Sequence, residues 1–319
     1  MNNILITSAG RRVSLVNHFK SACKELNLNS KIFITDLKPN MAPAFYFSDG
    51  YLDLPPTDSN KFIDKLITEC LKNKIKLIIP TSDLEILTLS NSKSVLNDNG
   101  IDIVISDTKL IDKCRDKRLT DELFKILEIE IIKKQSIENL YFPVFVKPYN
   151  GSLSKGIAVY NSIDEIPESQ LKNNDLIWMD YLSPNQFKEY TIDCYYDKLG
   201  LLKCLVPRER IEIRGGEISK GKTIKGLLHN RLFSSMKKLN GAIGCITLQV
   251  FASLDFSIIY GVEINPRFGG GYPLSFHAGA NFPLFILKEY FLNEQIEVYS
   301  DWIENKFMIR YDQEITFNL

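Results

Sequence analysis

The stretch GCITLQVFASLDFSIIYGVEINPRFGGG, residues 244–271, indicates the fold most directly. It contains two apolar runs, residues 245–252 and 257–264, with a short polar turn around Asp255 between them. Two apolar runs of this length joined by a polar turn are typical of a β-hairpin. We therefore expect two paired strands in this part of the chain.

Polar side chains gather at the end of this predicted hairpin. Strand alternation puts Glu263 and Asn265 on one face, with Gln249 facing them from the first strand. Mg²⁺ prefers such oxygen ligands, with substrate phosphates completing its shell. Arg267, just before a glycine run, could reach a transferring phosphate as a bidentate donor. The alternative interpretation is a solvated hairpin with an acidic residue at its end.

Composition limits the class of protein. The 319 residues, 45% of them hydrophobic, are enough for two or three globular domains. The 39 basic and 39 acidic residues cancel, so no overall field favours nucleic acid or an anionic membrane. No run of about 18 apolar residues and no cleavable leader is visible. We expect a soluble cytoplasmic protein that binds neither nucleic acid nor membrane.

Strands alternate with helices over about residues 1–107, which predicts a parallel, doubly wound sheet. Ligands of such sheets bind beyond the carboxyl ends of the strands. Arg11, Asp36, Asp83 and Glu85 lie there, although each also fits a helix cap or a solvated loop charge. The strands are expected at 4–8, 31–35, 76–80 and 101–105, and helices at 13–26, 58–73 and up to about 96.

The turn after the first expected strand is a further candidate site. A strand, a glycine turn and a helix N-terminus form a natural anion site. The turn contains only Gly10, so the GxGxxG pattern of dinucleotide-binding proteins is absent.

A second pair of strands encloses a flexible loop. Residues 108–127 have helical periodicity, and strands are then expected at 143–147 and 157–160. The glycine- and serine-bearing loop between these strands offers N–H groups to phosphate oxygens, with point charges from Lys147 and Lys155. A plain hairpin loop is the alternative.

Two later segments suggest substrate contacts. An apolar strand over 176–182 could pair its free backbone edge with a flat base, while the Glu189 carboxylate bonds ribose hydroxyls. Residues 204–226 are interpreted as a strand ending at Pro207 and a loop-rich span, which suggests recognition of an anionic acceptor. A solvated edge hairpin is the alternative for that span. Its cations are Arg208, Arg210, Arg214 and Lys220.

Together these segments resemble the ATP-grasp superfamily, and most closely its carbamoyl-phosphate-synthetase-like and biotin-carboxylase-like branch. The resemblance implies an α/β plus α+β chain, in which a Rossmann-like domain precedes a two-subdomain ATP-grasp fold. The implied limits are 1–107 for the Rossmann-like domain, 108–180 for a linker helix and lid, and 181–319 for the C-terminal subdomain with the metal and acceptor sites.

The resemblance also implies roles for individual residues. Arg267, Lys147 and Arg214 would be catalytic, and Gln249, Glu263 and Asn265 would be the metal ligands, with Gln where many relatives have Glu. His277 is more often a packing or capping residue than a base. Nucleotide-binding residues would be Lys117, Lys147, Ser152, Ser154, Lys155, Met179, Asp180, Leu182 and Glu189.

The implied activity is that of a ligase using ATP and Mg²⁺, or Mn²⁺ in its place. It would phosphorylate a carboxylate and couple the acyl phosphate to an amine, releasing ADP and phosphate. Chemistry on bicarbonate through carboxyphosphate, and a non-enzymatic ATP-binding protein, are the alternatives. The partners would be small-molecule carboxylates and amines, and relatives suggest a homodimer. The two substrates and the role of His277 stay open.

Overall fold

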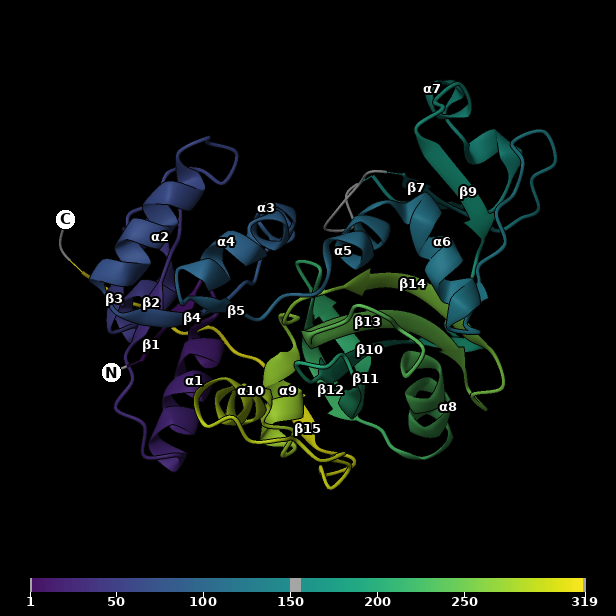
Figure 1. Ribbon diagram of the computed structural model, residues 1–319. Coiled ribbons are helices and arrows are strands. Elements are labelled where there is room, and N and C mark those ends of the chain that lie inside the picture. Colours follow the sequence, from purple (N-terminus) through teal and green to yellow (C-terminus); the bar gives the residue numbers. More distant parts are fainter. Residues whose placement is uncertain (1, 150–155, 318–319) are drawn as a thin grey trace.

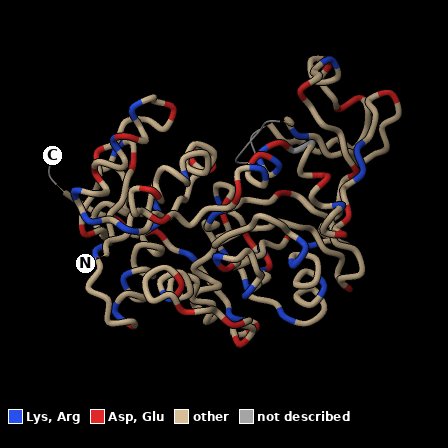
Figure 2. Tube along the Cα trace, in the orientation of Figure 1, with Lys and Arg blue, Asp and Glu red and all other residues tan. Residues whose placement is uncertain are grey.

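The computed structural model describes residues 2–149 and 156–317, whose strands form sheets of five, seven and three strands. The five-stranded sheet and its helices form one end of the molecule, and the three-stranded sheet projects at the other end, near β14 of the seven-stranded sheet (Figure 1). Lys and Arg alternate with Asp and Glu along the whole trace (Figure 2). Within the described ranges, no helix is long and apolar enough to cross a bilayer.

The N-terminal sheet confirms the predicted parallel, doubly wound arrangement. Its strand order is β3-β2-β1-β4-β5, and every pair is parallel. The buried apolar runs supply the strands, since ILI and IKLII place almost every side chain in the core. The elements are β1 (Asn3–Ile6), α1 (Val13–Glu25), β2 (Ile32–Ile34), the 3₁₀ turns η1 (Pro39–Met41) and η2 (Pro43–Phe47), β3 (Gly50–Tyr51), α2 (Phe62–Lys72), β4 (Ile75–Ile79), α3 (Ile86–Asn91), α4 (Lys93–Asp98) and β5 (Asp102–Ile103).

Two helix limits differ from the sequence prediction. Helix α2 begins at Phe62 because its N–H closes a turn onto the Ser59 carbonyl, so residues 58–61 are not helical. The helix expected to end near residue 96 is divided into α3 and α4 at Ser92. Neither change moves the strand ends.

The lid contains the predicted strand pair. Strand β7 (Val144–Pro148) pairs antiparallel with β8 (Ala158–Tyr160) and with β9 (Leu176–Asp180). The phosphate-loop residues 150–155 lie outside the described part. The other elements of this region are α5 (Thr108–Arg115), α6 (Lys117–Ile126), β6 (Glu130–Ile131), η3 (Ile163–Glu165) and α7 (Glu168–Leu171). The limits 107/108 and 180/181 stay a prediction.

The seven-stranded sheet contains the hairpin from which the sequence analysis began. Its order is β15-β12-β11-β10-β13-β14-β6, and only the β14–β6 pair is parallel. Gln249 pairs with Glu263, as the alternation predicted, and Thr247 pairs with Asn265. The elements are β10 (Phe187–Tyr196), β11 (Leu202–Arg214), β12 (Glu217–Thr223), α8 (Gly226–Met236), β13 (Gly244–Ser253), β14 (Ile259–Asn265), α9 (Tyr272–His277), α10 (Phe282–Phe291) and β15 (Phe307–Ile309).

The interpretation of residues 204–226 as loop-rich is wrong. Strand β11 continues through Pro207 to Arg214, turns at Gly215 and Gly216, and pairs with β12. Both glycines adopt positive φ, at 59° and 80°, which side-chain-bearing residues rarely adopt. The segment is a hairpin, as in the alternative interpretation, but it does not form the edge of the sheet, because β15 pairs with β12 on its outer side.

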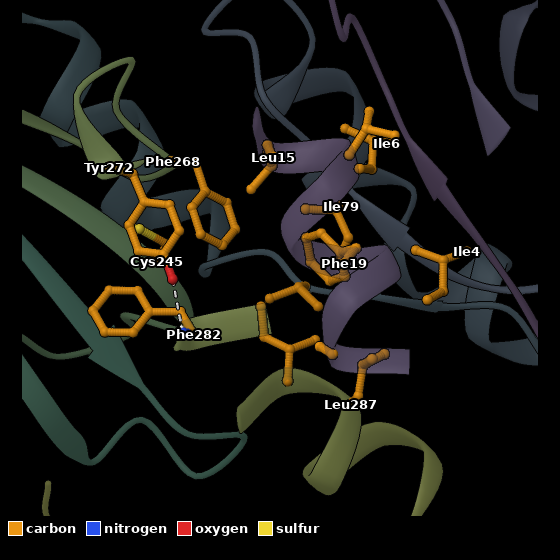
Figure 3. Packing of buried hydrophobic residues seen from close by; sticks show 14 of the residues in the cluster. Ile4, Ile6, Leu15, Phe19, Ile79, Cys245, Phe268, Tyr272, Phe282 and Leu287 are labelled. Atoms are coloured by element: carbon orange, nitrogen blue, oxygen red, sulfur yellow. Dashed lines mark hydrogen bonds between the residues drawn. The ribbon is translucent and has the colours of Figure 1, made fainter. Parts of the chain in front are cut away.

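One apolar cluster joins the N-terminal sheet to the larger sheet. Leu15 and Phe19 of α1 face Phe268 and Tyr272, which lead into and begin α9 (Figure 3). The rings of Phe19 and Phe268 lie 6.3 Å apart in an edge-to-face arrangement. Because this cluster spans both parts, they have a common core. Its other members in Figure 3 include Ile4, Ile6, Ile79, Cys245, Phe282 and Leu287.

Replacing Phe19 with Ala should destabilise the protein. Phe19 is fully buried, so the change leaves a cavity that typically costs about 3–5 kcal/mol. Urea unfolding followed by circular dichroism measures the loss. Leu199→Ala, at a side chain 79% exposed, is the control and should change the free energy of unfolding by less than about 0.5 kcal/mol. Equal effects of the two changes would contradict the shared core.

Candidate functional site

A pocket lies between the lid and the seven-stranded sheet. Lys147, Ile177 and Met179 line it from the lid, and Gly261 and Val262 line it from β14. Its other lining residues are Thr120, Asp121, Ile131, Ile132 and Lys134.

Gly261 allows α6 to pack closely on β14 behind the pocket. A Cβ atom at this position would stand 2.4 Å from the Phe124 ring, which is fully buried. A side chain at residue 261 would therefore push α6 outward and alter the pocket wall.

The predicted phosphate-binding residues are only partly described. Lys147 lines the pocket from β7, and its predicted contact with phosphates stays a prediction. Ser152, Ser154 and Lys155 lie outside the described residues. Lys117 begins α6, but its side chain is likewise outside the description.

The predicted adenine-binding strand has a defined free edge. Met179 pairs with Phe145 on one side and Lys134 on the other, so its backbone belongs to the sheet and its side chain faces the pocket. The Asp180 N–H donates to the Lys133 carbonyl. Within the described residues, the Leu182 N–H has no acceptor. The strand is therefore paired on both sides at Met179, and the backbone edge available to a flat base begins only after Asp180.

The three predicted metal ligands lie together on adjacent strands. The Asn265 amide donates from Nδ2 to Glu263 Oε1 at 2.8 Å, and the Glu263 side chain is exposed. The Gln249 Nε2 donates to Glu189 Oε1, which brings the predicted ribose ligand to the same place. Arg210 Nε lies 3.4 Å from Glu189 Oε2. Burial raises the pKa of Glu189 above its ordinary value, although the charge of Arg210 opposes this shift.

This donor set fits Mg²⁺ only with help from a substrate. One carboxylate and two side-chain amide oxygens are hard ligands of the type that Mg²⁺ accepts. Among the described residues, no group of three or more His, Cys, Asp or Glu could hold a metal. Phosphate oxygens would have to complete the shell.

Arg267 is held by the N-terminal part of the chain. Its Nε and Nη2 donate to the two carboxylate oxygens of Asp83, which follows β4, and the Nε distance is 2.8 Å. Burial disfavours the charged guanidinium, but Asp83 outweighs this effect and raises the pKa of Arg267. Asp83 was a candidate ligand residue, and the structure places it as the partner of this arginine.

The cations predicted between residues 204 and 226 do not converge. Arg208 is buried and forms a bidentate ion pair with Asp193, at 2.7 and 3.0 Å. Arg214 pairs instead with Asp312 at the exposed end of β11, and Lys220 pairs with Glu212. Strand pairing spreads these charges along a hairpin in which residues 208–214 pair with residues 217–223, where a loop would have gathered them. The catalytic role of Arg214 stays a prediction.

Two other N-terminal candidates have structural roles. The buried Glu85 accepts hydrogen bonds from the hydroxyls of Thr7 and Ser8 and from two N–H groups, so it ties the loops after β1 and β4 together. In the β1–α1 turn, the N–H groups of Ser8, Ala9 and Gly10 already have acceptors, while the anion site expected at the helix N-terminus stays a prediction. The Gly10 N–H, for example, donates to Asp36 at 3.2 Å.

Sequence reasoning missed Arg12, which lies at the start of α1 beside Arg267. Its guanidinium donates to the carbonyls of Phe268 and Thr81 at 3.0 and 2.9 Å. The available signal was a second arginine directly at a helix start, next to Arg11.

Comparison with family profiles agrees with this arrangement. Residues 4–104 match a family described as "PylC-like, N-terminal domain". Residues 172–313 match "ATP-grasp in the biosynthetic pathway with Ter operon". The chain is an ATP-grasp protein. Its α/β plus α+β fold, with a Rossmann-like domain before the ATP-grasp domain, is as the sequence analysis expected.

Solved structures resemble this ATP-grasp protein in fold. A pyruvate carboxylase from Rhizobium etli matches with TM-score 0.65 and 17% identity over 88% of this chain, which spans 27% of that enzyme. The biotin carboxylase domain dimer of 2-oxoglutarate carboxylase from Hydrogenobacter thermophilus, in complex with MgADP, ADP and bicarbonate, matches with TM-score 0.68 and 16% identity. The match covers 95% of this chain and 73% of the carboxylase chain.

An L-amino acid ligase from Bacillus licheniformis is also similar, with TM-score 0.64 and 15% identity over 91% of this chain and 74% of its own. Identities this low establish the fold alone. No curated protein matches the sequence.

His277 of this ATP-grasp protein is exposed at the end of α9. Its ring meets that of His18 at 5.6 Å, and His18 stacks on Phe276 at 3.6 Å. Burial, and then the charge of His277, lower the pKa of His18 to about 3. The pair packs α1 against α9, which favours the packing role.

Acid should destabilise the protein through His18. Its pKa is about 6.5 when unfolded and about 3 when folded, so below pH 6.5 the unfolded chain binds the extra proton and stability falls. Between pH 6.5 and about 5 the loss is on the order of 1–2 kcal/mol. His18→Phe should remove this part of the pH dependence in urea unfolding. An unchanged slope in the variant would contradict the burial of a neutral imidazole.

Proposed function

We propose that this chain is an ATP-dependent ligase that activates a carboxylate as an acyl phosphate and couples it to an amine. The observation that carries this proposal is the position of the pocket. It is lined by Lys147 and by Gly261 and Val262 of β14, and the next residue of that strand is Glu263. A nucleotide in the pocket would have its phosphates beside the polar strand pair.

The nucleotide would be held from both sides of the pocket. Lys147 would contact the phosphates as a point charge, and Glu189 would bond the ribose hydroxyls. The backbone of Leu182 would bind the base at the free edge after Asp180, with Met179 and Asp180 beside it. We assign the remaining phosphate contacts to Lys117, Ser152, Ser154 and Lys155.

Gln249, Glu263 and Asn265 would hold Mg²⁺, or Mn²⁺ in its place. The bound cation would supply charge neutralisation between the triphosphate and the carboxylate, which otherwise repel each other. Asn265 already orients the Glu263 carboxylate through its hydrogen bond.

The chemistry then requires positioning more than covalent participation. The substrate carboxylate oxygen attacks the γ-phosphorus, and ADP leaves. The amine attacks the carbonyl carbon of the acyl phosphate, and inorganic phosphate leaves as the amine loses a proton. Arg267 would stabilise the phosphate charge, and the fork of hydrogen bonds to Asp83 fixes its orientation beforehand.

A second candidate is carboxyphosphate chemistry on bicarbonate, which the fold similarity to a bicarbonate-bound biotin carboxylase domain favours. The similarity to an L-amino acid ligase favours the first candidate. For either one, we propose a cytoplasmic protein with small-molecule substrates. We also propose a homodimer, as in the biotin carboxylase domain.

Lys147→Ala should weaken binding of ATP by at least about tenfold, because a charged contact to the phosphates is lost. Isothermal titration with MgATP measures the dissociation constant. Lys65→Ala, on the exposed face of α2, is the matched control and should bind as the wild type does. Wild-type affinity in Lys147→Ala would remove this lysine from the site.

Turnover is tested by phosphate release from MgATP, with ADP and AMP separated by chromatography. The acceptor panel contains amino acids, short peptides, sugar acids and bicarbonate. We expect ADP only with a particular carboxylate and amine pair. Glu263→Ala should lower that rate by at least about a hundredfold, since the cation loses its carboxylate ligand, and Glu25→Ala, on the exposed end of α1, should not.

Other outcomes of this assay point elsewhere. ADP with bicarbonate alone favours the second candidate. AMP as the product contradicts the acyl-phosphate route. Tight ATP binding without turnover on any acceptor favours a non-enzymatic ATP-binding protein.

A further inference from the structure

Two arginines from distant parts of the chain meet at one main-chain carbonyl. Arg12 Nη1 donates to the Phe268 oxygen at 3.0 Å, and Arg267 Nη1 donates to the same oxygen at 3.3 Å. The second anchor of Arg12 is the Thr81 carbonyl after β4. The two guanidinium groups are therefore neighbours at the junction of the N-terminal sheet and the larger sheet.

Only one of the two charges is compensated by direct contact. Arg267 has a bidentate ion pair with Asp83. Arg12 has no ion pair among the described residues, and its hydrogen bonds go to neutral carbonyls. The nearby Glu217 already pairs with Arg310 at 3.0 Å. A half-buried cation without a carboxylate partner retains the capacity to bind an anion.

The charge of Arg12 survives at neutral pH despite this setting. Burial, and then repulsion from Arg267, lower its pKa to about 10. The acidic groups that face it, Glu217 and Asp83, raise the value only in part. Because Arg12 also remains partly exposed, an anion from solution can approach it.

Position decides what kind of anion this is. Along the chain, the proposed metal ligands Glu263 and Asn265 are followed by Arg267 and then by Phe268, whose carbonyl binds Arg12. Because Arg12 and Arg267 share this carbonyl, Arg12 lies beside the arginine assigned to the transferring phosphate. An anion held at Arg12 would therefore be a second charged group of the acceptor, next to the group that reacts.

We propose that Arg12 binds a second, non-reacting anionic group of the acceptor, which is therefore a dicarboxylate or a carboxylate that also bears a phosphate-type group. This inference rests on the proposed function. It narrows the acceptor to molecules with two separated oxyanions, one that reacts near Glu263 and one that anchors at Arg12.

A purely structural role would have a different signature. If Arg12 only fastened α1 to the Phe268 carbonyl, its loss would lower the melting temperature and leave ligand preference unchanged. Arg231 offers a matched control, since it also donates to two main-chain carbonyls, those of Phe256 and Ser257, and it lies on α8.

The test is titration calorimetry on the full chain saturated with MgADP. The probes are succinate, glutarate and adipate, each compared with the monocarboxylate of equal length, and the corresponding phosphonocarboxylates. The wild type should prefer one dianion over its monoanion by at least about tenfold, the size of one charge-assisted contact. Arg12→Gln should lose this preference, Arg12→Lys should keep part of it, and Arg231→Gln should keep all of it.

Three results would overturn the inference. One is a preference that survives in Arg12→Gln, and another is a wild type without preference for any dianion. The third is an Arg12→Gln variant whose affinity for MgADP falls while its preference for the dianion stays, which would mean that Arg12 binds the nucleotide.

A wild type that fails to bind MgADP refutes the nucleotide site itself, and the dianion series repeated without nucleotide then tests Arg12 separately. Carboxylate and phosphonate series together identify the anchoring group.

Discussion

The packing of Phe268 against α1 is the contact on which the candidate site depends. Its ring lies in the cluster that joins the two parts of the chain, edge-to-face with Phe19 (Figure 3). Its carbonyl oxygen accepts hydrogen bonds from Arg12 and Arg267. Burial of the Phe268 ring therefore also helps to place the side chains of Arg12 and Arg267, which bind the carbonyl of the same residue. The burial of the ring is non-directional, but the hydrogen bonds of the carbonyl are not, and together they fix where the guanidinium groups lie.

Electrostatics at the site follow from this junction. Asp83 comes from the loop after β4 and Arg267 from the end of β14, so their ion pair forms only when the two parts are packed together. On the sheet itself, Glu189 links Gln249 to Arg210. The polar face of the sheet is thereby oriented by side-chain hydrogen bonds before any ligand binds, and little reorganisation would be needed during transfer.

Local patterns predicted local structure well. The period-two alternation of β13 and β14 placed Gln249 opposite Glu263, because residue spacing alone determines the face of a strand. The predicted end of a strand at Pro207 is wrong, because β11 continues through this proline to Arg214. The contacts of Arg12 and Arg267 join residues far apart in the chain, and such contacts depend on how whole sheets pack, which no short pattern records.

The ion pair between Asp83 and Arg267 also restricts how such chains can be recombined. An N-terminal domain from a relative, joined to this ATP-grasp domain, would have to supply a carboxylate after its fourth strand to pair with Arg267. Its first helix would also have to present an apolar face that packs on the Phe268 ring, as Phe19 does here. A donor that lacks the carboxylate would leave Arg267 charged, mostly buried and without its orienting partner. The N-terminal domain in this sense orients a side chain of the candidate site, so an exchange of one part requires a matched change in the other.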